Sequence, residues 1–264
     1  MDIGIIGMGH LGKATLTGLL RGGTAPENLI VTARTEEAQK TLEEKYPGVA
    51  VTTDNREAAL KAGTVIIILR PQDAAGVLDE LKGLDLSDKT IISFMAGIRI
   101  SDIRKMLGNA RSAYRIIRMM PNLGISLCRG VIGVSFDEDS NGAEPVPDVF
   151  RKLGYLVRLP EDELENITVC AASGLGFAAY IMKQYKDSCN KLFADEAVSD
   201  EITRRVFETA IDMVRNDSSS FDRLVEQIST RGGTTEAGID VLKGSGLDTV
   251  MDGCFDAALA RVRK

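Results

Sequence analysis

The chain has 264 residues, of which 44% are hydrophobic and 27% charged, and its formal net charge at pH 7 is −6. This composition is typical of a globular protein and excludes a disordered or collagen-like chain. The net charge is acidic, and acidic and basic residues are mixed along the sequence. Both argue against nucleic acid as a partner, because phosphate binding needs a basic surface. The length lies near the upper limit for one hydrophobic core, so we expect two domains.

Three features predict a soluble protein of the cytoplasm. The most apolar runs, such as Val65–Leu69, are too short to cross a bilayer, so no membrane segment is expected. Met1 leads directly into an apolar run and a glycine turn, so we expect no signal peptide. The cysteines show no C-x-x-C spacing and are expected to be reduced thiols: Cys128, Cys170, Cys189 and Cys254.

Short β-branched runs alternate with helical stretches up to about Tyr155. The predicted strands are Ile3–Ile6, Leu29–Thr32, Val49–Val51, Val65–Leu69, Thr90–Ser93 and Ser112–Ile117. Predicted helices between them include Gly12–Arg21 and Glu36–Lys45. Apolar runs that lack period-2 alternation and are separated by helices indicate a parallel sheet covered on both faces. We therefore predict a doubly wound sheet of the Rossmann type.

The pattern changes after this region. Polar residues 137–147 predict a surface loop, and 148–153 and 155–159 predict a last helix and strand. After Pro160 no strand pattern returns: a long helix is expected from about Glu163, and a second with Ser199 as its N-cap, before Asp200 and Glu201. Its apolar stripe is Ile202, Val206, Phe207, Ala210, Ile211 and Val214. The sequence thus predicts an α/β domain over 1–160 and an all-helical domain over 161–264.

A glycine turn follows the first predicted strand. It consists of Gly7, Met8, Gly9, His10, Leu11 and Gly12, with the spacing G-x-G-x-x-G between a strand and a helix. Gly7 permits the tight turn, Gly9 lets a pyrophosphate approach the backbone, and Gly12 allows close contact between helix and strand. The free N–H groups at the start of the helix complete an anion site. We predict that these six residues bind a dinucleotide.

The end of the second predicted strand indicates which dinucleotide is bound. NAD-binding domains usually place an acidic residue there to bind the ribose 2′-hydroxyl. Here Arg34 and Thr35 follow the strand, and the planar guanidinium of Arg34 suits a 2′-phosphate. The predicted cofactor is NADP(H), with NAD as an alternative.

Loops with polar or small residues follow three further strands. They contain Arg70–Pro71–Gln72, then Ser93 with Ala96 and Gly97, and finally Arg118 to Asn122. Because ligands bind beyond the carboxyl ends of strands in such sheets, we expect these loops to face the nicotinamide.

A second possible anion site lies near the C-terminus, where Ser229 to Thr235 read S-T-R-G-G-T-T before an apparent helix. Two glycines and several hydroxyl groups in front of a helix can form a nest of N–H donors that suits a carboxylate. A flexible loop between helices is the alternative.

Taken together, these motifs resemble the pyrroline-5-carboxylate reductase family, whose members reduce a cyclic imine with NAD(P)H to make proline. The matching segments are Gly7–Gly12, Asn55 with Glu57, Arg70–Pro71–Gln72, Ser93 to Gly97, Ile116–Asn122, Ser173–Gly176 and Gly232–Thr235. The resemblance implies that Asn55, Arg70, Pro71, Ala96 and Gly97 join the cofactor site. It also implies dimers formed through helical domains, often assembled further.

The resemblance further implies a catalytic site for an imino-acid substrate. Its residues would be Thr230, Gly232, Gly233, Thr234, Thr235 and Asn122. Thr235 would contact the ring, while the loop from Gly232 would hold the substrate carboxylate. Three positions depart from the family pattern, namely Leu175, Phe177 and Arg231, and they put the identity of the imine in question.

Imine reduction suits a chain whose single histidine, His10, lies in the glycine turn predicted to bind phosphates. A ketone reductase needs an acid for the developing alkoxide, whereas hydride addition to a protonated imine yields a neutral amine. The site then has only to orient the two reactants, with Tyr180 as a possible proton donor.

Two alternatives stay open. One is an imine reductase or β-hydroxyacid dehydrogenase, although Tyr180 stands where the latter has lysine and Lys183 follows one turn later. The other is a non-catalytic NADP-binding protein, which the altered Phe177 and Arg231 would suit. No metal site is predicted.

Overall fold

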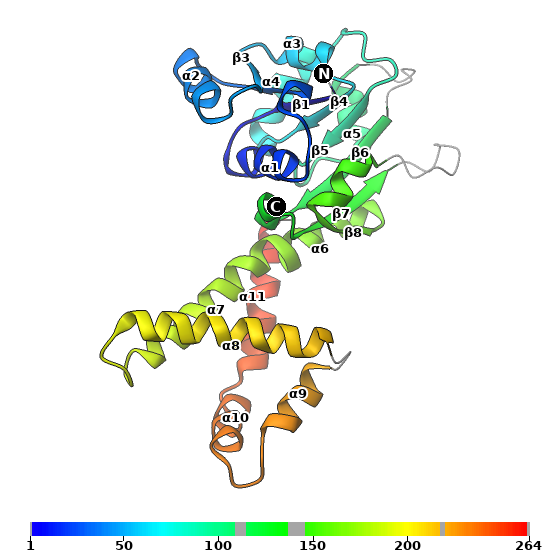
Figure 1. The fold of residues 1–264 in the computed structure, drawn as a ribbon. Coiled ribbons are helices and arrows are strands. Elements are labelled where there is room, and N and C mark those ends of the chain that lie inside the picture. Colours follow the sequence, from blue (N-terminus) through cyan, green and yellow to red (C-terminus); the bar gives the residue numbers. More distant parts are fainter. Residues whose placement is uncertain (1, 109–114, 137–145, 217–219, 263–264) are drawn as a thin grey trace. The chain divides into compact units, whose positions relative to one another are not determined.

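The computed structural model describes residues 2–108, 115–136, 146–216 and 220–262. It divides into two compact units (Figure 1). The first contains the residues up to Ala172, joined by the C-terminal residues from Arg261, and the second is Ser173–Ala260. The domain boundary after residue 160 stays a prediction; by packing, residues 161–172 belong to the first unit.

An eight-stranded sheet organises the first unit, in the order β3-β2-β1-β4-β5-β6-β7-β8. Its strands are β1 (Ile3–Ile6), β2 (Leu29–Thr32), β3 (Ala50–Thr52), β4 (Thr64–Ile67), β5 (Thr90–Ser93), β6 (Arg115–Pro121), β7 (Gly130–Phe136) and β8 (Gly154–Arg158). All neighbours are parallel except β6 and β7, which are antiparallel. The predicted doubly wound sheet and the all-helical C-terminal part are confirmed.

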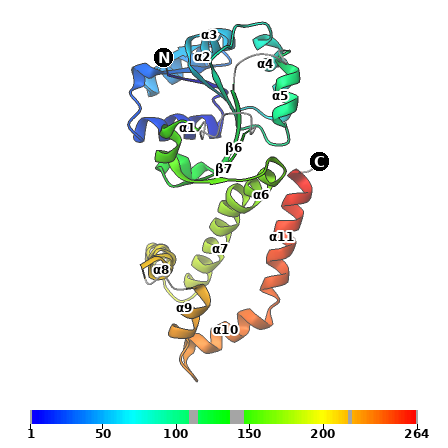
Figure 2. The ribbon, with the colours of Figure 1, turned by 90° about the vertical axis from the view of Figure 1, so that its right-hand side faces the viewer.

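Helices cover both faces of the sheet. The α-helices of this unit are α1 (His10–Arg21), α2 (Glu36–Lys45), α3 (Asn55–Lys61), α4 (Pro71–Leu81), α5 (Ile100–Met106) and α6 (Leu164–Ile167). Its 3-10 turns are η1 (Pro26–Asn28), η2 (Leu123–Leu127), η3 (Asp148–Leu153) and η4 (Glu161–Glu163). Figure 2 shows the sheet between α1 on one side and α4 and α5 on the other.

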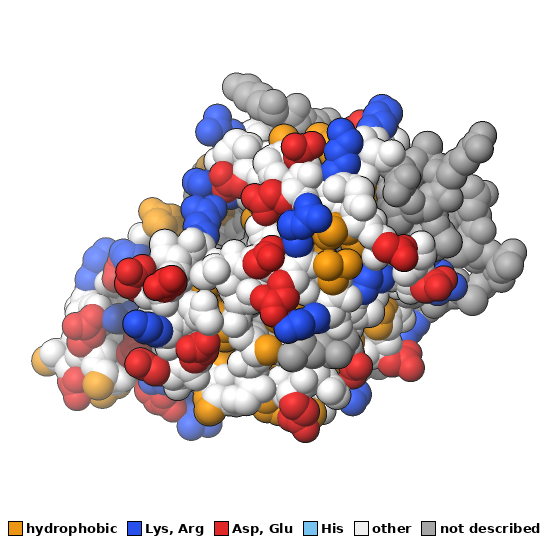
Figure 3. Space-filling model, turned by 90° about the horizontal axis from the view of Figure 1, so that it is seen from above, with side chains coloured by type: hydrophobic (Ala, Val, Ile, Leu, Met, Phe, Trp, Pro, Cys, Tyr) orange, Lys and Arg blue, Asp and Glu red, His pale blue; other side chains and the backbone are white. Residues whose placement is uncertain are grey.

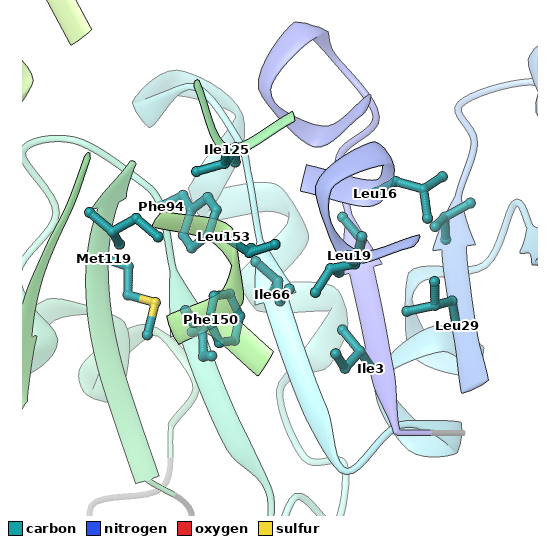
Figure 4. Packing of buried hydrophobic residues seen from close by; sticks show 14 of the residues in the cluster. Ile3, Leu16, Leu19, Leu29, Ile66, Phe94, Met119, Ile125, Phe150 and Leu153 are labelled. Atoms are coloured by element: carbon teal, nitrogen blue, oxygen red, sulfur yellow. The ribbon is translucent and has the colours of Figure 1, made fainter. Parts of the chain in front are cut away.

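Successive side chains of a buried strand point to opposite faces of the sheet, so two layers of apolar residues form, one on each face. Ile3 and Ile5 pack with α1 in one cluster, whereas Ile6 packs with α3, α4 and α5 in another. In the first cluster (Figure 4), the rings of Phe94 and Phe150 meet edge to face with centroids 6.5 Å apart. Burial of each such large side chain contributes about 1.5–3 kcal/mol.

Among the described strands, β7 is the one that the sequence did not predict. Its glycines weaken the strand pattern, but the packing requires them. A Cβ at Gly130 would lie 2.4 Å from the Ile125 side chain, and one at Gly133 would lie 2.8 Å from that of Ile167. Predicted residues 112–114 and most of the loop 137–147 lie outside the described residues.

The second unit is entirely helical in its described residues. It holds α7 (Gly174–Cys189), α8 (Glu196–Asn216), α9 (Phe221–Ile228), α10 (Thr234–Gly244) and most of α11 (Leu247–Val262). The predicted long helix from about Glu163 consists of α6, a π-helical turn named η5 (Thr168–Ser173) and α7. Tyr185 of α7 and Phe207 of α8 pack edge to face, with centroids 5.5 Å apart.

Ser199 was predicted as an N-cap, and this is wrong. Helix α8 begins one turn earlier, where the Asp195 carboxylate accepts from the Ala197 N–H at 2.9 Å. Ser199 is buried inside the helix, and its carbonyl accepts from the Thr203 hydroxyl at 2.8 Å. An acidic residue just before the helix therefore capped it in place of the serine.

Large apolar side chains of the second unit remain exposed. The most exposed are Leu192, Val241, Tyr180, Phe221 and Val250. Within the helical run Glu161–Cys189, one 18-residue window has a mean hydropathy of 1.3, and only 11% of that window is buried. By length and composition alone, this run could cross a membrane. The expectation that no stretch is long and apolar enough is therefore wrong. The same exposed surface is typical of a helix that packs against another protein chain.

Charged side chains of both signs are interspersed on the face shown in Figure 3. Elsewhere in the chain, many ion pairs join two side chains of the same helix. Examples are Lys183 with Asp187 on α7 at 2.6 Å and Arg205 with Glu201 on α8 at 2.8 Å. Exposed pairs of this kind contribute roughly 0–1 kcal/mol each, so the folding free energy depends mainly on the apolar layers.

The contact between α1 and η2 gives a test of the packing. A Cβ at Gly18 of α1 would lie 2.3 Å from the Ile125 carbonyl oxygen. We predict that Gly18→Ala lowers the free energy of unfolding by about 1–3 kcal/mol, measured by urea denaturation. Gly76→Ala in α4 is the matched control, because nothing lies within 4 Å of its added methyl. It should stabilise by about 0.5–1 kcal/mol, and equal effects at both positions would contradict the packing.

Candidate active site

The glycine turn has the geometry that its spacing predicts. Gly7 has φ +105°, and a Cβ there would lie 2.1 Å from the Ile68 carbonyl oxygen. A Cβ at Gly12 would lie 2.0 Å from the Gly7 carbonyl oxygen, so only glycine fits this crossing of helix and turn. Gly9 has nothing within 4 Å and leaves its face open to a ligand. Binding by these residues stays a prediction.

Helix α1 begins at the end of this turn, with Gly9 as its N-cap. No side chain caps the helix and no acidic residue lies in its first turn, so its N–H groups and positive dipole end are available to phosphates. His10 occupies the first helical position and is exposed, while Met8 and Leu11 pack against the core. The exposure of His10 beside the predicted phosphates fits a place near the cofactor.

Two arginines lie at the ends of the strands that flank β1. Arg34 follows β2, and Arg70 is the N-cap of α4, directly before Pro71. Both contact the Asp73 carboxylate, Arg34 through Nη2 at 3.3 Å and Arg70 through Nε at 3.0 Å. Thr35 caps α2, where its hydroxyl accepts from the Ala38 N–H at 3.2 Å. The predicted 2′-phosphate subsite was Arg34 with Thr35. The structure adds Asp73 and also Arg70, which the sequence analysis placed near the nicotinamide.

Asn55 is bound within the fold. Its amide donates to Glu80 Oε2 at 2.8 Å, near the C-terminal end of α4, whereas Arg70 and Asp73 lie at the other end of that helix. Glu57 accepts from Lys61 and Thr52, and these hydrogen bonds hold the pKa of its carboxyl below the usual value. The structure thus does not bring the Asn55 amide to the arginines, and its role toward a cofactor stays a prediction.

The loop after β5 is held by backbone hydrogen bonds. The Ser93 hydroxyl accepts from the Met95 N–H at 3.2 Å, and the Phe94 N–H donates to the Ile67 carbonyl at 2.9 Å. Ala96 is half-buried, and Gly97 is exposed with φ +73°. This fixed loop lies at the carboxyl end of the sheet, where ligands bind in doubly wound folds.

A buried charge cluster supports this loop. Arg118 of β6 is 1% exposed and donates to Glu161 Oε1 at 3.2 Å and to Glu165 Oε1 at 2.9 Å. The same two oxygens accept backbone N–H groups, from Ile100 at 2.7 Å and from Gly97 at 3.3 Å. Arg118 also donates to the Met95 carbonyl at 3.4 Å. The cluster therefore joins β6, the loop after β5 and the start of α6.

Sequence reasoning placed Arg118 in a strand-end loop and missed both glutamates. A signal existed, because a charged residue inside the apolar run Ile116–Met120 must find partners when the strand is buried. What the sequence could not indicate is that those partners come from residues more than forty positions later.

Asn122 acts as a structural junction. Its Oδ1 accepts the N–H groups of Gly124 and Val131 at 3.1 and 3.2 Å, and its Nδ2 donates to the Ala171 carbonyl at 3.1 Å. These bonds fix η2 to the start of β7 and to η5. A part in catalysis stays a prediction, carried by the second N–H of its amide.

The predicted carboxylate loop is a closed turn before α10. The Gly233 N–H donates to the Thr230 carbonyl at 2.8 Å, and Gly232 has φ +72°. The Gly232 N–H donates to Glu236 Oε2 at 2.6 Å, so one donor of the nest already holds a carboxylate of the chain itself. The N–H groups of Thr234 and Thr235, in the first turn of α10, have no partner within the helix and suit an anion.

The other acid–base side chains considered in the sequence analysis lie on α7. Tyr180, the possible proton donor, is 64% exposed on α7, and Lys183 is paired with Asp187. The four cysteines are free thiols, as predicted. Within the described ranges, no group of three or more His, Cys, Asp or Glu side chains is arranged to hold a metal ion.

The first unit has the doubly wound sheet and the glycine turn that are typical of NAD(P)-dependent oxidoreductases, and the chain is an enzyme of that class. Comparison with known families agrees. Residues 2–97 match a family described as NADP oxidoreductase, coenzyme F420-dependent, and residues 161–264 match one described as pyrroline-5-carboxylate reductase dimerisation. The chain is similar to pyrroline-5-carboxylate reductases over nearly its whole length, and its C-terminal part matches their dimerisation family.

Relatives of nearly full length carry the same family name. The pyrroline-5-carboxylate reductase of Staphylococcus saprophyticus is 29% identical, covering 99% of this chain and 96% of its own. The solved structure of a pyrroline-5-carboxylate reductase from Coxiella burnetii superposes with a TM-score of 0.84 at 28% identity, over 99% of this chain and 97% of its own. The Plasmodium falciparum enzyme, solved with NADP bound, superposes with a TM-score of 0.88 at 20% identity, covering 100% and 97%, and shows the fold.

The charge cluster predicts a large effect of one substitution. Arg118→Met should lower the free energy of unfolding by about 3 kcal/mol, because it leaves two partly buried carboxylates without their cation. Arg99→Met, at an exposed position just before α5, should change it by less than about 0.5 kcal/mol.

Urea denaturation measures the free energy of unfolding of both variants. Adding Glu161→Gln and Glu165→Gln to Arg118→Met should restore part of the loss, since the unpaired charges are removed. Similar stabilities of the Arg118 and Arg99 variants would contradict the cluster.

Proposed function

We propose that the protein reduces 1-pyrroline-5-carboxylate to proline by hydride transfer from NADPH. The observation that carries the proposal is the glycine–threonine loop at Gly232–Thr235, at the start of α10. Its N–H groups suit a carboxylate, and the chain is similar to pyrroline-5-carboxylate reductases over 99% of its length. NADP fits the arginines that follow β2 and β4. NADH remains the alternative cofactor.

The proposed chemistry needs no resident acid. The imine nitrogen enters protonated, the hydride adds to the imine carbon, and the electron pair of the C=N bond goes to nitrogen, which becomes a neutral amine. No alkoxide forms, so orientation is the main task of the residues. The exposed position of His10 at the first turn of α1 is consistent with this scheme.

The hydroxyacid dehydrogenase alternative is less well supported. Its interdomain lysine is replaced by Tyr180, and Lys183 is engaged by Asp187 at 2.6 Å. An imine reductase that acts on another ring is the second alternative, because Leu175, Phe177 and Arg231 depart from the family pattern.

The second unit supports self-association. Its exposed apolar side chains suit a second copy of the chain, and residues 161–264 match the dimerisation family. We include a homodimer formed through this unit in the proposal. The predicted cytoplasmic location rests on the sequence and stays part of the same proposal.

Thr235 provides the test of the carboxylate nest. Thr235→Ala should lower kcat/KM for 1-pyrroline-5-carboxylate by about 10- to 100-fold, the loss of one hydrogen bond to a charged group. With 1-pyrroline, which lacks the carboxylate, the loss should be small. Thr249→Ala, at an exposed position of α11, is the matched control and should leave both rates unchanged. Equal losses with both imines in folded protein would refute the carboxylate nest.

His10 provides the test of the proton scheme. His10→Asn should keep most of kcat, because the imine arrives protonated. Steady-state kinetics give kcat of the variant, and a titration gives its dissociation constant for NADPH. A loss of kcat beyond about a hundredfold with unchanged NADPH affinity would show that His10 transfers a proton.

A further inference from the structure

Three charged side chains from two strand ends meet beside the glycine turn. Arg34 and Arg70 both contact the same oxygen of Asp73, Oδ2, at 3.3 and 3.0 Å. Because β2 and β4 pair with β1 on its two sides, the arginines flank the turn that follows β1. The cluster therefore lies where a doubly wound fold receives the ribose of a dinucleotide.

Stability does not account for this cluster. The side chains of Arg34 and Arg70 are 77% and 67% exposed, and exposed ion pairs contribute little to folding. Each guanidinium carries five N–H donors, and the contacts to Asp73 use one nitrogen of each. Two cations share one carboxylate, so one positive charge remains to attract an anion.

We propose that Asp73 is an internal counter-anion that competes with the 2′-phosphate of NADPH for Arg34 and Arg70, and so sets the preference between NADPH and NADH. The inference rests on the cofactor of the proposed function. A 2′-phosphate that binds Arg34 and Arg70 must displace the Asp73 carboxylate from them, and that carboxylate also repels the phosphate. NADH has a neutral 2′-hydroxyl and does not take part in this exchange.

The sign of the effect follows from Coulomb's law. Removing the Asp73 charge removes a repulsion toward the phosphate and frees both guanidinium groups. Asp73→Asn keeps the shape of the side chain and should lower the dissociation constant of NADPH about three- to tenfold. The dissociation constant of NADH should stay the same.

The experiment is a titration of wild type and variants with NADPH and with NADH, followed by the fluorescence of the reduced nicotinamide. Asp102→Asn is the matched control, since Asp102 lies in the first turn of α5 and pairs with Lys105 at 3.3 Å, so its loss costs a comparable helix contact. It should leave both cofactors unaffected. In salt of about 1 M, where the screening length falls to about 3 Å, the advantage of Asp73→Asn should largely disappear.

The outcomes distinguish the role proposed for Asp73 from the assignment of NADPH as the cofactor. Weaker NADPH binding by Asp73→Asn, or a change confined to NADH, would overturn the proposal, because Asp73 would then organise the arginines or bind the ribose hydroxyl. An unchanged ratio of the two cofactors would overturn it as well. Arg34→Ala tests the cofactor assignment separately: it should weaken NADPH about 10- to 100-fold and NADH hardly at all. Equal losses for both cofactors would refute that assignment.

Discussion

The candidate site depends most on the ion pairs that the buried guanidinium of Arg118 forms with Glu161 and Glu165. A charge that is 1% exposed must be paired, and its partners Glu161 and Glu165 come from the segment that leads toward the helical unit. Each carboxylate also holds a backbone N–H of the loop after β5. One charge thus determines the conformation of a loop at the carboxyl edge of the sheet and the start of α6.

The parallel strand order adds the second constraint. Because β2, β1 and β4 are neighbours and run in one direction, their ends bring the glycine turn, Arg34 and Arg70 to one edge. The three glycines of the turn act differently: Gly7 takes a positive φ, Gly9 stays open, and Gly12 allows contact. Local backbone geometry and the topology of the sheet together form the predicted anion site without a buried cation.

Much of this could be predicted from the sequence. The β-branched runs of β1, β2 and β5 were predicted with their observed bounds, because buried parallel strands need continuous apolar residues. Strand β7 was missed, since Gly130 and Gly133 are selected by close packing and not by strand preference. Partners remote in sequence, such as Glu165 for Arg118, depend on the folded topology, which local patterns do not encode.

Hydride transfer to the imine carbon is the central claim, and an isotope experiment tests it most directly. NADPH deuterated at C4 on the transferred face, incubated with the protein and 1-pyrroline-5-carboxylate, should give proline with one deuterium at C5, detected by NMR spectroscopy. The Thr249→Ala variant should give the same product. Consumption of NADPH without deuterium at C5, or no consumption by folded protein, would contradict the account.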